Sequence, residues 1–328
     1  MPFSVSLVTG AAGFIGAHLV HQLVRQGKQV HVIVRPSTRL DRLFPVLQEI
    51  TVHRLDLADA TALEACLAQV SPGHVYHLAA DTRPRATSLF TAVCGATQAN
   101  LSATLTLVEA LAALHRPPRV LVRAATLAEY GPTGTASHEE TLPRPETAYG
   151  AGMLATTAAL GVLAPSLPFP VISARLALCY GPDQSPSFLV AEAIHALLEG
   201  RAVTLAHPDD RRDLMHVEDA VAGLLRIAQV IPADSPVLNI GTGHAPRMED
   251  VLEMIRILVG LPPDFVRRAA SVVPRRASEL QMNPRLAWRR LGWRAAIGLE
   301  EGLARTLAAE RRAREVALAA ALRMEARA

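Results

Sequence analysis

The sequence predicts an α/β protein with a doubly wound parallel sheet and a smaller C-terminal domain. In the first half, short β-branched runs alternate with segments of helical period. The predicted strands cover residues 5–8, 29–34, 49–53, 75–78, 120–122 and 171–174, and the helices cover 14–26, 60–69, 97–114 and 148–163. Because such alternation places parallel strands between two helical layers, a ligand is expected beyond the carboxyl ends of the strands.

The regular alternation of strands and helices ends after Gly181-Pro182, which marks the expected domain boundary. The later segments are a helix over 186–199, a strand over 203–205, helices over 217–229 and 248–259, and an Ala/Arg-rich amphipathic tail from Arg305 onward. We therefore expect one domain over residues 1–180 and a second, intertwined domain over 181–328. Segment 213–241 is expected to return to the first domain.

Composition bounds the class of protein. The chain has 328 residues, is half apolar, and carries 33 basic and 30 acidic residues, so a large core is expected. Lys28 is the only lysine, and the arginines are scattered rather than grouped with aromatic residues, which argues against nucleic-acid binding. Cys66, Cys94 and Cys179 lack the spacing of a disulfide frame, and no metal-ligand pattern is seen. We see no signal peptide, and no uninterrupted apolar run approaches about 20 residues, so we expect a cytoplasmic protein without membrane contact.

Three glycines follow the first predicted strand. Gly10 permits a tight turn, Gly13 lets the backbone approach a pyrophosphate, and Gly16 lets the helix pack closely. Ala12, Phe14 and Ile15 complete the loop and the helix start, whose free N–H groups and positive dipole end favour phosphate. The order of strand, glycines, helix and strand predicts a dinucleotide cofactor.

The end of the second strand bears on which cofactor is bound. An NAD enzyme usually places an acidic residue here to bind the ribose hydroxyls. This chain has Arg35, followed by Ser37 and Arg39. Because a guanidinium pairs with phosphate and a carboxylate repels it, NADP(H) is favoured over NAD(H). The alternative is that these arginines belong to an ordinary solvated loop.

Two segments, Thr9 to Gly16 and Tyr149 to Met153, together resemble the extended short-chain dehydrogenase/reductase family, whose members include NAD-dependent epimerases and dehydratases. Further segments match the family in order: Asp56-Leu57, His77 to Ala80, Asn100 to Thr104, Arg175, Tyr180 to Pro182, Arg212 to Val217, Asn239 to Gly243 and Leu291 to Gly302. The resemblance covers nearly the whole chain and implies a Rossmann domain. It also implies a set of cofactor contacts: Asp56 and Leu57 near the adenine, Leu78, Ala79 and Ala80 beside the cofactor, Asn100 on the following helix, and Tyr149.

The same resemblance implies a catalytic set. Thr126 would orient the substrate oxygen and Tyr149 would donate a proton to a carbonyl. The family's lysine, which holds the nicotinamide ribose and lowers the pKa of the tyrosine, is replaced by Met153. A thioether has neither charge nor donor for these tasks. Three interpretations stay open: Tyr149 is a weakened acid helped by water or an arginine, it only positions substrate, or the protein is a non-catalytic NADP(H)-binding regulator.

The missing lysine favours reduction over oxidation, because only oxidation needs a competent base. A phenol beside the substrate carbonyl, as in aromatic polyketides, could supply the proton itself. The sequence therefore predicts an NADPH-dependent ketone reductase for a natural-product carbonyl, such as an antibiotic-pathway ketoreductase. The expected substrate contacts lie on five separate segments and are mostly apolar: Asp81, Leu127, Leu178, Phe188 and Met215, with Leu89 and Phe90 nearby.

The alternative substrate is a nucleotide sugar. Family members that act on such substrates keep an arginine at the position of Arg212 and a second one near Arg275 or Arg276, which can clamp a diphosphate. Against this, Leu178 stands where those enzymes have an asparagine that contacts the sugar nucleotide. The resemblance also implies a homodimer through the helices over 97–114 and 148–163.

Overall fold

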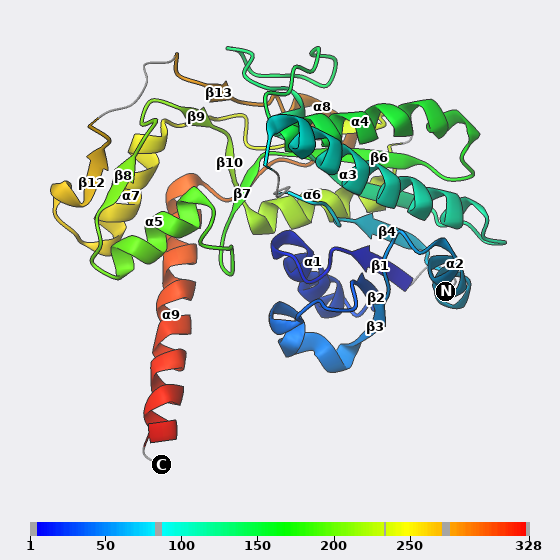
Figure 1. Cartoon of the computed structure of the whole chain (residues 1–328), viewed down its shortest axis with the longest axis horizontal. Coiled ribbons are helices and arrows are strands. Elements are labelled where there is room, and N and C mark those ends of the chain that lie inside the picture. The colour runs from blue at the N-terminus through cyan, green and yellow to red at the C-terminus, as the bar shows by residue number, and fades with distance from the viewer. Residues whose placement is uncertain (1–4, 83–86, 233, 271–275, 326–328) are drawn as a thin grey trace.

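A seven-stranded parallel sheet forms the centre of the protein (Figure 1). The computed structural model describes residues 5–82, 87–232, 234–270 and 276–325. The strand order is β11-β6-β5-β4-β1-β2-β3, and every neighbouring pair is parallel. The strands are β1 (Val5–Thr9), β2 (Gln29–Val34), β3 (Ile50–Arg54), β4 (His74–His77), β5 (Val120–Thr126), β6 (Val171–Leu176) and β11 (Val237–Ile240). The predicted α/β fold class is confirmed.

Helices cover both faces of this sheet (Figure 1). On one face α1 (Phe14–Arg25) and α6 (Val217–Val230) share a buried apolar cluster with the strands. On the other face α2 (Ala60–Val70), α3 (Leu89–Ala112) and α4 (Ala148–Leu163) form a second cluster. Helix α3 begins eight residues earlier than predicted, because Ser88 and Thr91 form a capping box at its start.

A smaller lobe lies beside the sheet, with its own apolar cluster. It contains α5 (Leu189–Leu198), α7 (Met248–Val259), the start of α9 (Leu299–Glu325), and the parallel pair β8 (Val203–Leu205) and β12 (Val266–Arg268). The remaining elements are β7 (Leu178–Tyr180), β9 (Arg211–Arg212), β10 (Leu214–His216), β13 (Glu279–Leu280), α8 (Arg285–Leu291) and the short 3-10 turns η1 (Asp41–Glu49), η2 (Leu127–Glu129), η3 (Ala164–Ser166) and η4 (Pro263–Phe265). The described part of α9 runs away from the lobe (Figure 1).

Helices α3 and α4 lie close together where Gly152 faces the backbone of Ala96. A Cβ at Gly152 would come within 2.7 Å of the Ala96 carbonyl oxygen, so the glycine is required for this approach. One helical segment, Ala148–Ser166, is long and apolar enough to cross a membrane by length and mean hydropathy, although glycine and threonine residues interrupt its apolar run. In the structure this helix, α4, packs against α3 and β5 as part of the layer that covers the sheet.

Candidate active site

The glycine loop joins β1 to α1 in the conformation that a dinucleotide site needs. Gly10 has a φ of +68°, and a Cβ there would come within 2.6 Å of the Leu78 and Ala79 backbone, so only glycine fits. A Cβ at Gly16 would lie 2.2 Å from the Gly10 carbonyl oxygen, which places this glycine against the loop rather than the sheet.

The start of α1 suits a phosphate. Gly13 is the N-cap residue, no side chain caps the helix, and the first turn holds no acidic residue. A Cβ at Gly13 would meet only the Gly10 oxygen, at 3.1 Å, so the loop is open on that side for a ligand. Free backbone N–H groups at an uncapped helix start are the usual partners of a pyrophosphate. The residues therefore fit a dinucleotide cofactor, with Ala12, Phe14 and Ile15 at the same loop.

The residues expected around the adenosine end lie on neighbouring loops. Arg35 follows β2 directly and is exposed, whereas Arg39 forms an exposed ion pair with Asp41 at 3.0 Å. Asp56 follows β3, where its carboxylate accepts a hydrogen bond from the Ala58 N–H, and the neighbouring Leu57 is buried. Arg35 is therefore better placed than Arg39 to offer its guanidinium to a ligand.

The segment after β4 is fixed by buried polar groups. Leu78, Ala79 and Ala80 continue the strand past its end. The Asn100 side chain accepts a hydrogen bond from the Asp81 N–H at 2.8 Å and donates one to the Ala96 carbonyl. In this arrangement Asn100 holds the loop that would border a cofactor.

His77 packs at the end of β4. Its ring nitrogens lie 2.7 Å from the Thr9 hydroxyl and 2.9 Å from the Thr104 hydroxyl. Burial lowers the pKa of His77 to about 3, with Arg123 adding to the effect. The ring is therefore neutral at working pH and acts as a structural link between β1, β4 and α3.

Thr126 and Tyr149 are brought together at the carboxyl end of β5. Thr126 is the last residue of this strand, Tyr149 lies in the first turn of α4, and their side chains are hydrogen-bonded. Burial raises the pKa of Tyr149 to about 12, although Arg123 and the Thr126 hydrogen bond act in the opposite direction. At neutral pH the phenol is protonated, so it can donate a proton but rarely accept one.

Met153 lies one helical turn after Tyr149, is 2% exposed, and contacts a buried arginine that sequence reasoning missed. The Arg123 Nη2 donates to the Met153 carbonyl at 3.1 Å and lies 3.5 Å from the Met153 sulfur. Arg123 itself is 2% exposed in the middle of β5. The predicted strand ended at residue 122, because an arginine interrupted the apolar run. The sequence feature that could have identified Arg123 is the charged residue itself, because arginine is almost never fully buried unless it is paired.

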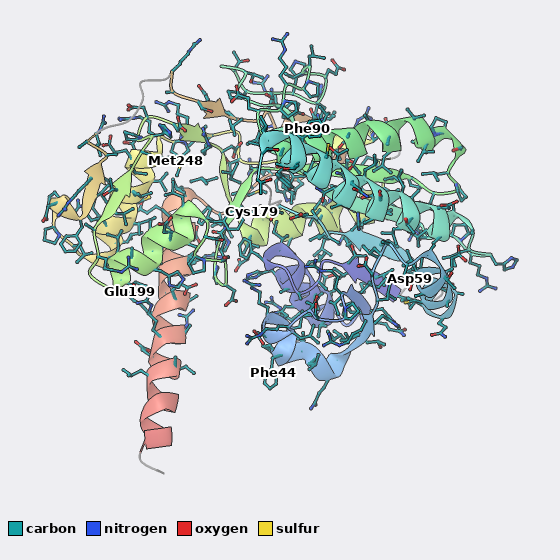
Figure 2. The ribbon with its side chains drawn as sticks, in the orientation of Figure 1. Phe44, Asp59, Phe90, Cys179, Glu199 and Met248 are labelled. Atoms are coloured by element: carbon teal, nitrogen blue, oxygen red, sulfur yellow. The ribbon has the colours of Figure 1, made fainter. Side chains whose placement is uncertain are left out.

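The expected substrate contacts divide into two groups. Leu178 and Phe188 are 37% and 41% exposed, which suits residues that border an open cleft. The assignment of Leu127 and Met215 to the substrate pocket was wrong, because both have no exposed surface and belong to the core cluster. Figure 2 shows Cys179, the neighbour of Leu178, between the sheet and the smaller lobe.

The other residues expected near the substrate are two apolar side chains, Leu89 and Phe90, and one arginine, Arg212. Leu89 and Phe90, at the start of α3, are 73% and 78% exposed. Figure 2 labels Phe90. The Arg212 guanidinium donates to the Asp210 carboxylate and to the Ser278 carbonyl, at 2.8 and 2.7 Å. Arg212 is therefore tied to its own lobe. Arg275 lies outside the described residues.

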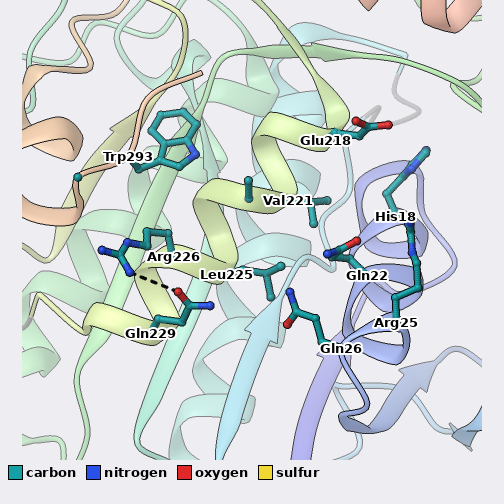
Figure 3. A pocket seen from close by; sticks show the side chains of 12 residues that line it. His18, Gln22, Arg25, Gln26, Glu218, Val221, Leu225, Arg226, Gln229 and Trp293 are labelled. Atoms are coloured by element: carbon teal, nitrogen blue, oxygen red, sulfur yellow. Dashed lines mark hydrogen bonds between the residues drawn. The ribbon is translucent and has the colours of Figure 1, made fainter. Parts of the chain in front are cut away.

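Two hollows border the Rossmann helices, and they differ in their relation to the site. Figure 3 shows a hollow of about 540 Å³ between α1 and α6, lined by His18, Glu218 and Trp293 among others. The glycine loop, Thr126 and Tyr149 do not line it, so it is not the candidate active site. A second hollow of about 610 Å³ is lined by Ala12 and Arg39 and therefore adjoins the glycine loop.

Comparison with known proteins defines the class. A model of the NAD dependent epimerase/dehydratase family matches residues 6–241, and the chain belongs to this family. The family places the protein among nicotinamide-dependent enzymes of the oxidoreductase type. Binding of a nicotinamide dinucleotide is supported by both the family and the open glycine loop.

Among its relatives, the chain is 30% identical to a UDP-glucose 4-epimerase of Mycolicibacterium smegmatis over 311 residues, covering 92% of this chain and 97% of the relative. It is 26% identical to a GDP-6-deoxy-D-mannose reductase of Pseudomonas aeruginosa, covering 90% and 93%. A solved structure of MoeE5 in complex with UDP-glucuronic acid and NAD is 33% identical with a TM-score of 0.81, covering 94% and 99%. Other relatives are longer: the chain spans 46% of a trifunctional UDP-glucose 4,6-dehydratase, epimerase and reductase of Arabidopsis thaliana.

Proposed function

We propose that the protein is an NADPH-dependent reductase of a carbonyl group on a nucleotide-linked sugar. The observation that carries the proposal is the placement of Tyr149 beside Thr126 at the carboxyl ends of the strands, where the glycine loop also lies, with Met153 in the lysine position. Burial raises the pKa of Tyr149, which favours its protonated form. Relatives that act on nucleotide sugars support the substrate class. This changes the preferred substrate from the aromatic ketone expected from the sequence alone.

The direction of reaction follows from the state of Tyr149. Epimerases and dehydratases of this family first oxidise the sugar, which requires a base that removes a hydroxyl proton. A phenol with a pKa of about 12 holds its proton at neutral pH, so it is a poor base. When bound, a reduced nicotinamide supplies hydride to a carbonyl carbon. Thr126 would then hold the carbonyl oxygen, and Tyr149 would deliver the proton to it.

NADP(H) is proposed over NAD(H) on the basis of Arg35. This side chain is exposed at the end of β2, and the residues that follow it, Pro36, Ser37 and Thr38, carry no negative charge. A guanidinium there can pair with a ribose 2′-phosphate. NADPH and NADH dissociation constants, measured by fluorescence titration, test this assignment directly.

A second candidate function is reduction of a hydroxylated aromatic ketone. It is favoured by four exposed apolar side chains on segments expected to border the substrate: Leu89, Phe90, Leu178 and Phe188. In such a substrate a phenol next to the carbonyl could supply the proton, and Tyr149 would only position it.

Absorbance of NADPH, followed with matched substrates, separates the candidates. The panel contains UDP-4-keto-6-deoxy-D-glucose, an ortho-hydroxyaryl ketone and the methyl ether of that ketone. Consumption with the sugar nucleotide supports the first candidate. Consumption with the hydroxyaryl ketone but not its ether supports the second. Tight NADPH binding without consumption of any of them would contradict both and favour a cofactor-binding regulator.

The proposed assembly is a cytoplasmic homodimer through α3 and α4. These helices lie together on one face of the sheet, and Val162 near the end of α4 is 81% exposed. Light scattering on the purified protein tests this, with a monomer mass as the contradicting result.

A further inference from the structure

Arg123 is an unusual residue for its position. It lies in the interior of β5, between Val122 and Ala124, and is 2% exposed. A buried guanidinium loses its hydration and is costly unless acceptors and charges compensate it. Its presence so close to the candidate proton donor calls for a physical reason.

The acceptors of Arg123 are mostly neutral. Nη1 donates to the Thr157 hydroxyl at 2.8 Å, and Nη2 donates to the Met153 carbonyl at 3.1 Å with the Met153 sulfur at 3.5 Å. Glu129 is the nearest anion in this network, and it is reached only through Thr157, whose hydroxyl donates to Glu129 Oε1 at 2.9 Å. Within the described part of the chain, no carboxylate forms a direct ion pair with Arg123.

Glu129 is already neutralised by another partner. Arg175 Nε donates to Glu129 Oε2 at 2.8 Å, and both side chains are almost fully buried. The network therefore contains two buried cations and one buried anion, and the anion is in contact with Arg175 rather than with Arg123. Glu129 also acts on Arg123, but through Thr157 rather than in contact, so these three groups carry one more positive than negative charge and Arg123 is the guanidinium with no carboxylate in contact.

That positive charge lies beside the Tyr149 turn of α4. Tyr149 and Met153 are four residues apart on a helix, so their side chains occupy the same face. The guanidinium that touches Met153 is thus close to the phenol, and each affects the ionisation of the other. The other groups that act on the phenol are Thr126 on β5, Glu129 on η2 and Cys179 on β7.

We propose that Arg123 supplies, from β5, the positive charge that the family places on α4 as a lysine, and that it acts on the Tyr149 phenol as an electrostatic partner. Arg123 is a positioning residue that acts through Tyr149, because its buried guanidinium has no surface to offer a substrate. The inference rests on the proposed role of Tyr149 as proton donor, but its test does not need turnover.

Met153 completes this arrangement. A lysine at this position would bring an ammonium group against the Arg123 guanidinium, and two buried like charges in contact repel strongly. An uncharged, flexible side chain that accepts weakly through sulfur fits beside the guanidinium. The proposal therefore links two features of the site: residue 153 on α4 is uncharged, and the positive charge near Tyr149 comes from Arg123 on β5 instead.

The test is the ionisation of residue 149 in the full-length protein. Trifluorotyrosine incorporated at position 149, whose phenol ionises well below tyrosine's range, is titrated by fluorine NMR in the absence of cofactor. Arg123→Met is expected to raise the phenol pKa by about one unit or more, because an opposite charge nearby favours the phenolate. Arg123→Lys is expected to keep it near the original value, and Arg226→Met, on the exposed side of α6, is expected to leave it unchanged.

The double variant Arg123→Met/Met153→Lys moves the charge back to α4 and is expected to restore the lower pKa. Arg123→Met/Met153→Gln, which restores no charge, is its matched control. A phenol pKa that stays within about 0.3 unit in Arg123→Met would overturn the proposal, since measured couplings between close charges are larger. If Arg123→Met does not fold, an Arg123→Lys pKa matching that of the natural chain supports the proposal, and a shifted one contradicts it. Failure of the sugar-reductase proposal would appear only in the NADPH assay, so the two outcomes are distinguishable.

Discussion

Introducing a lysine at position 153 is expected to destabilise the protein, and Arg123 is the reason. The Met153 sulfur lies 3.5 Å from Arg123 Nη2, so an ammonium group in its place would be close to the guanidinium. Two like charges about 4 Å apart repel by about 4 kcal/mol at an effective dielectric constant of about 20. This energy corresponds to a lowering of the lysine pKa by about 3 units.

The sign of the pH dependence follows from that shift. A lysine with a pKa of about 10.4 when unfolded and about 7.5 when folded binds its proton more weakly in the folded state. The penalty in the free energy of unfolding is therefore complete below about pH 7.5 and disappears as the pH approaches about 10.4. Met153→Lys is expected to lose about 4 kcal/mol of stability at pH 7 and to recover most of it at pH 10.

Urea denaturation of four proteins measures this coupling: the natural chain, Met153→Lys, Arg123→Met and the double variant. Burying a lysine costs desolvation in any background, so the quantity of interest is the difference between the Met153→Lys penalty with and without Arg123. We expect about 4 kcal/mol for this difference at pH 7. Met153→Gln controls for a polar group of similar length. An interaction energy below about 0.5 kcal/mol would refute the placement of a charged Arg123 beside residue 153.

Three further predictions test the cofactor loop and the proton donor. Arg35→Asp is expected to weaken NADPH binding by about tenfold to a hundredfold and to reverse the preference toward NADH, measured by fluorescence titration with Arg39→Ala as control. Gly10→Ala is expected to lose about 3 kcal/mol or more in urea denaturation, because its Cβ meets backbone atoms, whereas Gly27→Ala, with a φ of +67° and nothing within 4 Å, should lose about 1 kcal/mol. Tyr149→Phe is expected to lower kcat about a hundredfold or more with a sugar nucleotide while the NADPH dissociation constant stays constant. Unchanged kcat with a hydroxyaryl ketone would instead favour proton supply by the substrate.

The sequence predicted most of the sheet, because its strands are buried on both faces and read as continuous apolar runs. It did not predict the pair formed by β7 and β10, which joins residues far apart in the chain through three paired positions. Nor did it predict η1, whose residues include Pro45. Short elements of this kind depend on tertiary contacts that the local sequence does not encode.

The sequence predicted those parts of the candidate site in which the residue type itself indicates a specific role. Glycines at fixed spacing and a tyrosine near the start of a helix carry such information, and the structure places them at one edge of the sheet. Apolar residues do not: Leu127 and Leu178 look alike in the sequence, but the first is core and the second is partly exposed. Arg123 was overlooked because its role depends on α4 packing against β5, a contact that brings residues 123 and 153 together.

Under the proposed role of Arg123, two tasks that one lysine usually performs in the family are separated. A lysine on α4 reaches both the phenol and the nicotinamide ribose, whereas Arg123 is enclosed by Thr157 and Met153 and reaches no open surface. The electrostatic task can therefore be retained while the ribose contact is lost. Cofactor affinity must then come from the glycine loop and the end of β2, where Arg35 is exposed. This division is consistent with a reductase, because a reductase needs a tuned proton donor at Tyr149 but not the strong base that sugar oxidation requires.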